Sequence, residues 1–148
     1  MPSLVLEPLQ GTFGVRFGAG RDAIRGLLGV PGDSYRKGTD VDTWLDGQLH
    51  VFYSDRSLLV EYIEVFSAPN LHVSCAGVEL FNQPAAKVVE SLKAAAQTEP
   101  DVADGGASVT FPQLELSLWR PFVSKRGEGS QFQSVGIGRA GYYSAMVV

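Results

Sequence analysis

The sequence predicts an α+β protein made of two similar units, each a helix followed by an antiparallel meander, packed as one body. The main observation is that the chain repeats itself, and a repeat decides the architecture wherever one is present. Shifted by 64 residues, three apolar positions recur: Phe17, Ile24 and Leu28 align with Phe81, Val88 and Leu92. Shifted by 58 residues, a hairpin pattern recurs: Asp46-Gly47, Val51, Tyr53, Leu58 and Val60 align with Asp104-Gly105, Val109, Phe111, Leu116 and Leu118.

The first unit is expected to span about residues 12–76. Residues 12–17 alternate between apolar and small or polar side chains, as a half-buried strand does. Arg21 to Leu28 is predicted as a helix, because its apolar residues share one side and the glycine and proline that follow would stop it. After a polar loop at 32–43, the Asp46-Gly47 turn introduces the meander. Its strands are predicted at 48–53, 57–66 and 71–76.

The second unit is expected to span about residues 77–138. Pro84 suits the first turn of a helix that ends near Gln97. Its strands are predicted at 78–81, 107–111, 114–120 and 131–138, with a loop at 98–106 and a hairpin tip at 124–130. Each unit has one apolar helix stripe and one apolar sheet face, so the units must cover each other. A continuous antiparallel sheet joining them is favoured, because it removes two exposed strand edges.

The composition excludes several classes of protein. The 148-residue chain is 45% hydrophobic and 19% charged, which is typical of a globular protein. A net charge of −4 argues against a nucleic-acid partner, which needs a basic surface. Cys75 is the only cysteine, so neither an intrachain disulfide nor a cysteine-based zinc site can form. With no signal-peptide pattern and no apolar run of membrane length, we expect a cytoplasmic protein without a membrane partner.

One stretch resembles a known repeat. The segment from Gly20 to Pro31, followed by a loop and then Trp44-Leu45-Asp46-Gly47 with two strands, is similar to the unit found in tandem in β-lactamase inhibitor proteins. The same unit occurs once in small outer-membrane lipoproteins of the barrel-assembly machinery. The likeness covers residues 14–66 more closely than 77–135, where the helix ends in Ala-Ala-Ala-Gln instead of Leu-Gly-x-Pro.

This resemblance implies a fold and a habit of binding other proteins through a concave sheet. It carries over no particular target. The inhibitor family carries disulfides and the lipoproteins a lipidated cysteine near the N-terminus, and this chain has neither feature. A second likeness is to small acidic immunity proteins that neutralise bacterial toxins, many of which are cytosolic α+β domains.

Glu61 and Glu64 are the carboxylates most worth testing. On a regular strand they point to opposite faces, so one meets the core side unless a bulge realigns them. A carboxylate on an apolar face would have a raised pKa and could act as an acid or base. The favoured alternative is structural, with one glutamate paired to an arginine and the other in water. Arg120 is the expected partner for either.

The other candidate sites are weaker. His50 and His72 lie on separate predicted strands without a metal-binding spacing, so we expect no metal. Cys75 is expected to be a buried hydrophobe rather than a nucleophile. The strings Gly18-Ala19-Gly20 and Gly136-Ile137-Gly138 lack the third glycine and the acidic residue of a dinucleotide site, so no cofactor is expected. No catalytic residue is assigned.

The aromatic residues are more informative. Both faces of a strand cannot be core in a two-layer protein, so Phe52 or Tyr53, and Tyr62 or Ile63, should point outward. Outward aromatic residues with nearby charges are typical of protein-binding surfaces, although helices and the C-terminal tail covering them all remains the marginally favoured reading.

We therefore expect a non-enzymatic module that binds another protein through the outer sheet face and the loops at 32–43 and 124–130. Its concrete form would be an inhibitor or immunity protein acting on a bacterial toxin or enzyme. The alternative is a small-molecule-binding or catalytic protein that uses a crevice between the units, lined by His50, Glu61, Glu64 and Arg120. An adaptor role and a homodimer stay open. The candidate binding residues are Phe52, Glu61, Glu64, Trp119, Arg120, Lys125 and Arg126.

Overall fold

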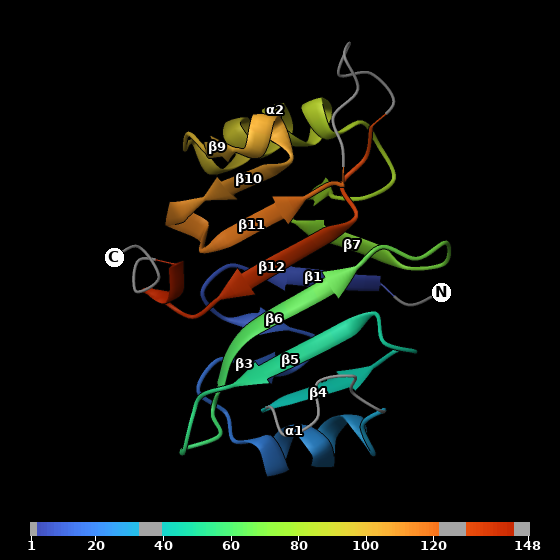
Figure 1. Cartoon of the computed structure of the whole chain (residues 1–148), viewed down its shortest axis with the longest axis vertical. Helices are drawn as coiled ribbons and strands as arrows, with labels where there is room; N and C mark the ends of the chain where they lie inside the picture. Colours follow the sequence, from blue (N-terminus) through green and yellow to red (C-terminus); the bar gives the residue numbers. More distant parts are fainter. Residues whose placement is uncertain (1–2, 33–39, 122–129, 144–148) are drawn as a thin grey trace.

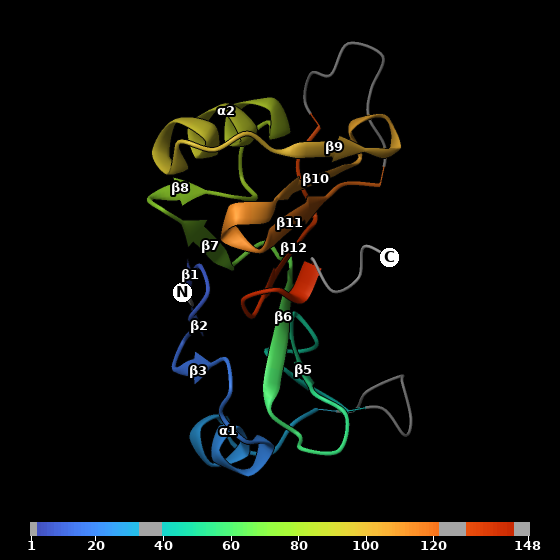
Figure 2. The same cartoon turned by 90° about the vertical axis from the view of Figure 1, so that its left-hand side faces the viewer.

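The computed structural model describes residues 3–32, 40–121 and 130–143 and contains two β-sheets packed face to face (Figures 1 and 2). The larger sheet is antiparallel throughout. Its order is β4 (Val41–Trp44), β5 (Leu49–Tyr53), β6 (Val60–Phe66), β12 (Ser134–Gly138), β11 (Leu116–Trp119), β10 (Ser108–Phe111) and β9 (Asp101–Ala103). The protein is therefore α+β, and strands from both halves of the chain join in this one sheet through the β6–β12 pair.

The smaller sheet lies behind the larger one in Figure 1. Its order is β3 (Val15–Arg16), β2 (Gly11–Thr12), β1 (Ser3–Glu7), β7 (His72–Cys75) and β8 (Val78–Glu79). Strands β1 and β7 run parallel, and the other pairs are antiparallel. The helices α1 (Arg21–Leu28) and α2 (Ala85–Ala96) lie at opposite ends of this layer, as Figure 2 shows.

The core lies between the two sheets and under the two helices. Alternate residues of each strand of the larger sheet point inward, so that Val51, Ile63 and Ile137 are fully buried. The smaller sheet contributes Leu4, Leu6 and Val73 from its central pair of strands. Burying apolar surface on this scale is the main favourable contribution to folding.

Both helices form where the sequence predicts them. Helix α1 ends at Gly29, whose φ of 90° is easy only for glycine, and its N–H bonds to the carbonyl of Arg25. Pro84 stands immediately before α2, and Gln97 in a left-handed conformation ends it. Ile24 is the one buried residue of α1, whereas Leu27 on the expected apolar side is 55% exposed.

The predicted strand at 12–17 is wrong. The chain forms two short strands, β2 and β3, joined by a two-residue turn at Phe13-Gly14 with φ values of 51° and 80°. Two successive positive φ values are typical of the hairpin turn that matches strand twist. A phenylalanine in the first position hides that signal, because aromatic residues favour strands.

Three further strands were not expected. All of β4 except Trp44 lies inside the segment 32–43 predicted as a loop. β9 lies inside the segment 98–106 predicted as a loop, followed by two 3₁₀ turns, η1 (Asp104–Gly106) and η2 (Pro112–Leu114). β1 precedes the predicted first unit and pairs with β7 about 70 residues later, with Leu4 opposite Val73. None of these three strands has the strong local pattern that would identify it.

The alignment by 58 residues does not correspond to a structural equivalence. It matches β5 with β10 and β6 with β11, and the inward residues Val51 and Val109 agree with this. However, β5 and β10 run in the same direction, while their meanders approach the centre of the sheet from opposite edges. If β5 is laid on β10 with the core-facing sides matched, β6 and β11 fall on opposite sides of that strand. The two strand pairs are therefore mirror images, and no rotation superposes them.

Candidate functional site

The outer face of the larger sheet, which points away from the smaller sheet, is the candidate site. Figure 2 shows neither α1 nor α2 over it, among the residues that the structure describes. Strand register defines its central row as His50, Glu64, Gly136, Ser117 and Thr110. The flanking rows contain Phe52, Tyr62 and Gly138 on one side and Phe66, Ser134, Trp119 and Ser108 on the other.

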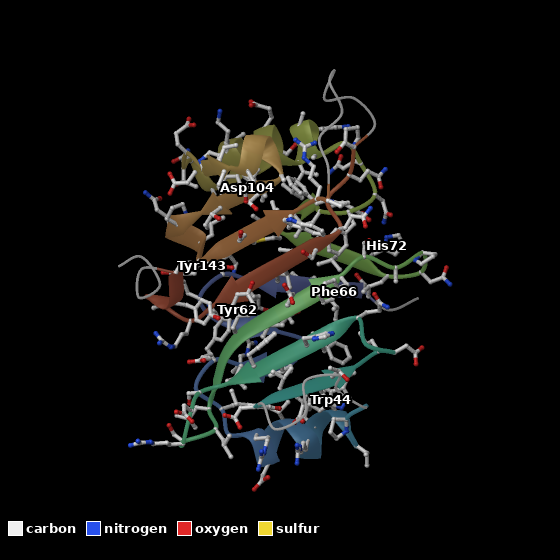
Figure 3. All side chains as sticks on the ribbon, in the orientation of Figure 1. Trp44, Tyr62, Phe66, His72, Asp104 and Tyr143 are labelled. Atoms are coloured by element: carbon white, nitrogen blue, oxygen red, sulfur yellow. The ribbon has the colours of Figure 1, made fainter. Side chains whose placement is uncertain are left out.

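Six rings form a connected aromatic strip across part of this face: Phe66, His50, Phe52, Tyr62, Tyr142 and Tyr143. Tyr62 is its centre. The Tyr142 ring stacks on the Tyr62 ring at 4.6 Å and 16°, and the Phe52 ring meets Tyr62 edge-on at 5.4 Å. Figure 3 shows Tyr62 and Tyr143 next to each other, with Phe66 further along β6. Such pairs add stability beyond the area that they bury.

The glycines of the Gly136-Ile137-Gly138 string make room for two of these rings. A Cβ atom at Gly136 would lie 1.6 Å from the Tyr62 hydroxyl oxygen, and one at Gly138 would lie 2.5 Å from the Cβ of Tyr142. Both distances are shorter than any real contact, so no side chain larger than hydrogen fits there. The string is therefore explained by ring packing on β12.

The residues after β12 turn back over the outer face. We call residues 139–143 the C-terminal turn. Glu115, in a left-handed conformation with φ of 48°, is 6% exposed and accepts hydrogen bonds from the backbone N–H groups of Gly141 (2.9 Å) and Tyr143 (3.0 Å). The Tyr143 hydroxyl donates to the Tyr62 hydroxyl at 3.1 Å. Burial, followed by the interaction with Tyr143, raises the pKa of Tyr62.

A bulge in β6 interrupts the alternation expected for Glu61 and Glu64. Phe52 pairs with Tyr62 but Tyr53 pairs with Val60, which leaves Glu61 as the extra residue. Both glutamates consequently lie near Tyr142, whose phenol pKa is raised by burial first and then by these two charges. Glu61 also accepts the backbone N–H of Arg139 at its carbonyl (2.9 Å) and forms a 3.9 Å ion pair with the Arg139 side chain.

The expected ion pair of Arg120 with Glu61 or Glu64 is not formed. Arg120 is 9% exposed and donates to the carbonyl of Gly106 (3.0 Å) and to the hydroxyl of Ser130 (2.9 Å). Its neighbour Trp119 lies on the outer face and is 44% exposed. The structure therefore places Phe52, Glu64 and Trp119 on the outer face but separates Arg120 from them. Lys125, Arg126 and most of the loops at 32–43 and 124–130 lie outside the described residues.

The remaining candidate residues, His50, His72 and Cys75, have contacts typical of structural residues. His50 Nε2 lies 2.8 Å from the carbonyl of Gly47 and donates to it. His72 Nδ1 lies 2.9 Å from Glu79, and this contact lowers the pKa of the Glu79 carboxyl. Burial raises the pKa of the Cys75 thiol to about 11, which is unfavourable for a nucleophile. Within residues 3–32, 40–121 and 130–143, no group of three metal-binding side chains is found.

A buried polar network that the sequence did not reveal lies at the α1 end. Arg25 donates from Nε and Nη2 to both oxygens of Asp42 at 2.8 Å, and the Tyr53 hydroxyl donates to the same carboxylate at 2.9 Å. Burial alone would raise the pKa of Asp42, but hydrogen bonds from Arg25 and Tyr53 outweigh it and lower that pKa. The network joins α1, β4 and β5, so its geometry indicates a structural role.

Three hollows in the described part of the chain have volumes of about 280, 460 and 210 Å³. The first two lie on either side of the Leu45-Asp46 turn, and the third lies at the start of α1. Their linings include none of His50, Glu61, Glu64 and Arg120, the residues assigned to a crevice between the units. These hollows therefore do not support the alternative of a small-molecule or catalytic site in a crevice between the units.

None of the described helices is long and apolar enough to span a membrane. Comparison of this chain with protein-family models, with curated proteins and with solved structures finds no match.

Proposed function

We propose that this chain is a non-enzymatic module that binds another protein through the outer face of its larger sheet. The observation that carries the proposal is a seven-stranded sheet face that neither α1 nor α2 covers, and that bears an aromatic strip and an exposed Trp119. Tyrosine, tryptophan and phenylalanine are enriched in protein interfaces, because their rings bury a large area with few rotatable bonds. A partly buried network of packed rings also fixes the shape of this face before a partner arrives.

The concrete form that we propose is an inhibitor or immunity protein acting on a bacterial toxin or enzyme. A net charge of −4 favours a partner with a basic surface, because complementary charge speeds encounter. The cytoplasm is the proposed location. Its support is that Cys75, the only cysteine, is buried as a free thiol and needs no oxidising compartment.

We also propose that the two halves of the chain are related, with different residue equivalences from those of the 58-residue shift. The turn Phe13-Gly14 in the β2–β3 hairpin matches Ala76-Gly77 in the β7–β8 hairpin, and both turns have two positive φ values. Each hairpin is followed by a helix and by strands of the larger sheet. In this scheme β4, β5 and β6 correspond to β10, β11 and β12, which are related by a rotation about the sheet normal.

Site-specific photocrosslinking tests the binding face directly. Trp119 is replaced by p-benzoylphenylalanine, which keeps an exposed aromatic ring at the same place. The matched control replaces Val5, which is 54% exposed on the opposite side of the molecule. In the native cell extract, we expect position 119 to crosslink one dominant protein and position 5 not to crosslink that protein. The same product from position 5 alone would refute the proposed face.

The energetic test follows once that partner is purified. Trp119→Ala should weaken the affinity roughly thirtyfold, which corresponds to about 2 kcal/mol for a central aromatic anchor. Phe13→Ala serves as a matched control, because Phe13 is 59% exposed on a hairpin of the smaller sheet. Equal losses from the two substitutions would contradict the assignment of the outer face.

A further inference from the structure

We propose that the C-terminal turn of residues 139–143 is a releasable cover over Tyr62, held closed by the carboxylate of Glu115. This inference rests on the proposed function for its consequence, since the cover occupies part of the proposed binding face. The cover itself is argued from contacts within this chain. Its test therefore needs no partner.

Glu115 is the main attachment. It lies between η2 and β11, 26 and 28 residues before the two amides that it binds. Each carboxylate oxygen accepts one backbone N–H of the turn, Oε1 from Gly141 and Oε2 from Tyr143. Hydrogen bonds to a charged acceptor are stronger than those between neutral groups. One side chain in the β10–β11 connection thus holds the end of a distant segment.

The turn covers the centre of the aromatic strip. The Tyr142 ring stacks on one side of Tyr62, and the Tyr143 hydroxyl bonds to the Tyr62 hydroxyl. Gly138 permits this approach, because any side chain there would collide with Tyr142. Removing the turn would uncover the Tyr62 ring and its hydroxyl on the outer face. These are the groups that an interface uses, an apolar ring with a polar tip.

The turn can open without disturbing the core. None of residues 139–143 is fully buried, and Arg139, Ala140 and Gly141 are exposed, whereas Ile137 just before them is 0% exposed. Besides Glu115, the turn is held by the bond from the Arg139 N–H to the Glu61 carbonyl (2.9 Å), by the bond between the Tyr143 and Tyr62 hydroxyls (3.1 Å), and by the 3.9 Å ion pair between the partly exposed side chains of Arg139 and Glu61. Segments held by a few surface contacts open with a much smaller free energy than the whole protein.

The consequence for binding is a competition. A partner that needs Tyr62 must first displace the turn, and its apparent affinity is reduced by the fraction of molecules that are open. Loosening the turn should therefore tighten binding through this face. Glu115 would act as a positioning residue that sets the open fraction without touching the partner.

The test uses Glu115→Gln in the full chain. Glutamine keeps the size of the side chain but can accept only one of the two N–H groups, while its own amide N–H opposes the other. We expect the Gly141 and Tyr143 amides to exchange hydrogen at least tenfold faster, and Ile137 exchange to be unchanged. Photochemical polarisation by a flavin dye, measured by NMR, should reveal a newly accessible Tyr62 ring. Glu90→Gln, on the exposed surface of α2, is the matched control.

Two results would overturn the inference. One is a folded Glu115→Gln variant in which Tyr62 accessibility and Gly141 exchange stay at the parental level. The other is an Ile137 amide that accelerates together with Gly141, because the turn would then open only with the sheet. If Glu115→Gln fails to fold, Tyr142→Ala removes the stacked ring and leaves Glu115 intact. It should expose Tyr62 in the same assay, and an inaccessible Tyr62 there refutes the cover.

Failure of this inference is distinguishable from failure of the proposed function. The exchange and ring-accessibility measurements use the isolated chain, whereas photocrosslinking from position 119 requires the partner. A confirmed cover with no crosslink would leave a detachable turn on a face that binds no protein. A crosslink without a cover would leave a binding face that is always open.

Discussion

The two ends of the larger sheet each hold a buried charge through an arginine contact, but in different ways. At the α1 end, Arg25 forms a two-point ion pair with Asp42, and Tyr53 donates a third hydrogen bond to the same carboxylate. Asp42 is almost completely buried, while 40% of the Arg25 side chain is exposed. The charge deepest in this network is therefore negative, and it depends on two donors.

At the α2 end, the partners of Arg120 among the described residues are neutral. This arginine donates to the carbonyl of Gly106 and to the hydroxyl of Ser130, and its guanidinium lies 5.7 Å from the centre of the Phe132 ring. No ion pair of Arg120 is found among the described residues. Here the buried charge is positive, and it is stabilised by dipoles and by the face of an aromatic ring.

This difference predicts how the stability of each end should respond to mutation and to pH. Removing one partner of a buried ion pair leaves a charge and its other donors unsatisfied, which costs more than losing a bond between a charge and a dipole. Only the ion pair contains a group that titrates at moderately acidic pH. The two ends should therefore differ both in mutational cost and in pH dependence.

The largest effect is expected for Asp42→Ala. It leaves the buried Tyr53 hydroxyl and the Arg25 guanidinium without their acceptor, so the free energy of unfolding should fall by about 3 kcal/mol. Urea unfolding followed by circular dichroism measures this. Asp101→Ala, at an exposed position of β9, is the control and should change stability little. A loss below about 1 kcal/mol for Asp42→Ala would show that the pair contributes no more than a surface ion pair.

Arg120→Met should have an intermediate effect. Methionine retains the apolar stem that packs beside Phe132, and among the described residues the change removes hydrogen bonds with two neutral acceptors. We expect the free energy of unfolding to fall by about 1–2 kcal/mol. The control is Arg139→Met, whose parent side chain is 46% exposed. A loss as large as that of Asp42→Ala would remove the distinction between the two ends.

Tyr53→Phe should lower the free energy of unfolding by less, about 1 kcal/mol, because it removes one of the three hydrogen bonds that Asp42 accepts from described side chains and keeps the ring in the core. Thermal unfolding at neutral pH gives the change. In a double-mutant cycle, the variant with both Tyr53→Phe and Asp42→Ala should lose less unfolding free energy than the sum of the two single losses. Additive losses would mean that the hydroxyl and the carboxylate act independently.

The smallest effect is a pH dependence that separates the two ends. The folded-state pKa of Asp42 lies below its ordinary value, so its contribution is complete above about pH 4 and declines as pH falls through the folded pKa. The stability difference between the parent chain and Asp42→Asn should therefore narrow on acidification. For Arg120→Met no such narrowing is expected, because the partners of Arg120 among the described residues are a carbonyl and a hydroxyl, which carry no charge. Denaturant unfolding at several pH values measures both differences.

Much of the local structure followed from the sequence. Gly29 and Pro84 mark the limits of the two helices, because one permits a positive φ and the other suits a helix start. Alternating apolar residues located β5, β6 and β12. The N-terminal hairpin did not follow, because Phe13 occupies a left-handed position that its residue type rarely adopts.

The candidate site could be predicted only in part. Alternation predicted one outward residue in each of the pairs Phe52/Tyr53 and Tyr62/Ile63, and the structure places Phe52 and Tyr62 there. A bulge near Glu61 was foreseen as an option but not placed. The partners of Arg120 and the anchoring role of Glu115 were missed. Both depend on residues brought close by the pairing of β10, β11 and β12, and no local pattern encodes such contacts.

What the sequence alone determined is the identity and extent of most elements, since backbone preferences and side-chain period act over a few residues. What only the tertiary structure decided is their arrangement: β12 between β6 and β11, β1 parallel to β7, and the turn held by Glu115. The physical reason is that backbone hydrogen bonds join strands without regard to residue type. The choice of neighbour therefore rests on packing across the whole core.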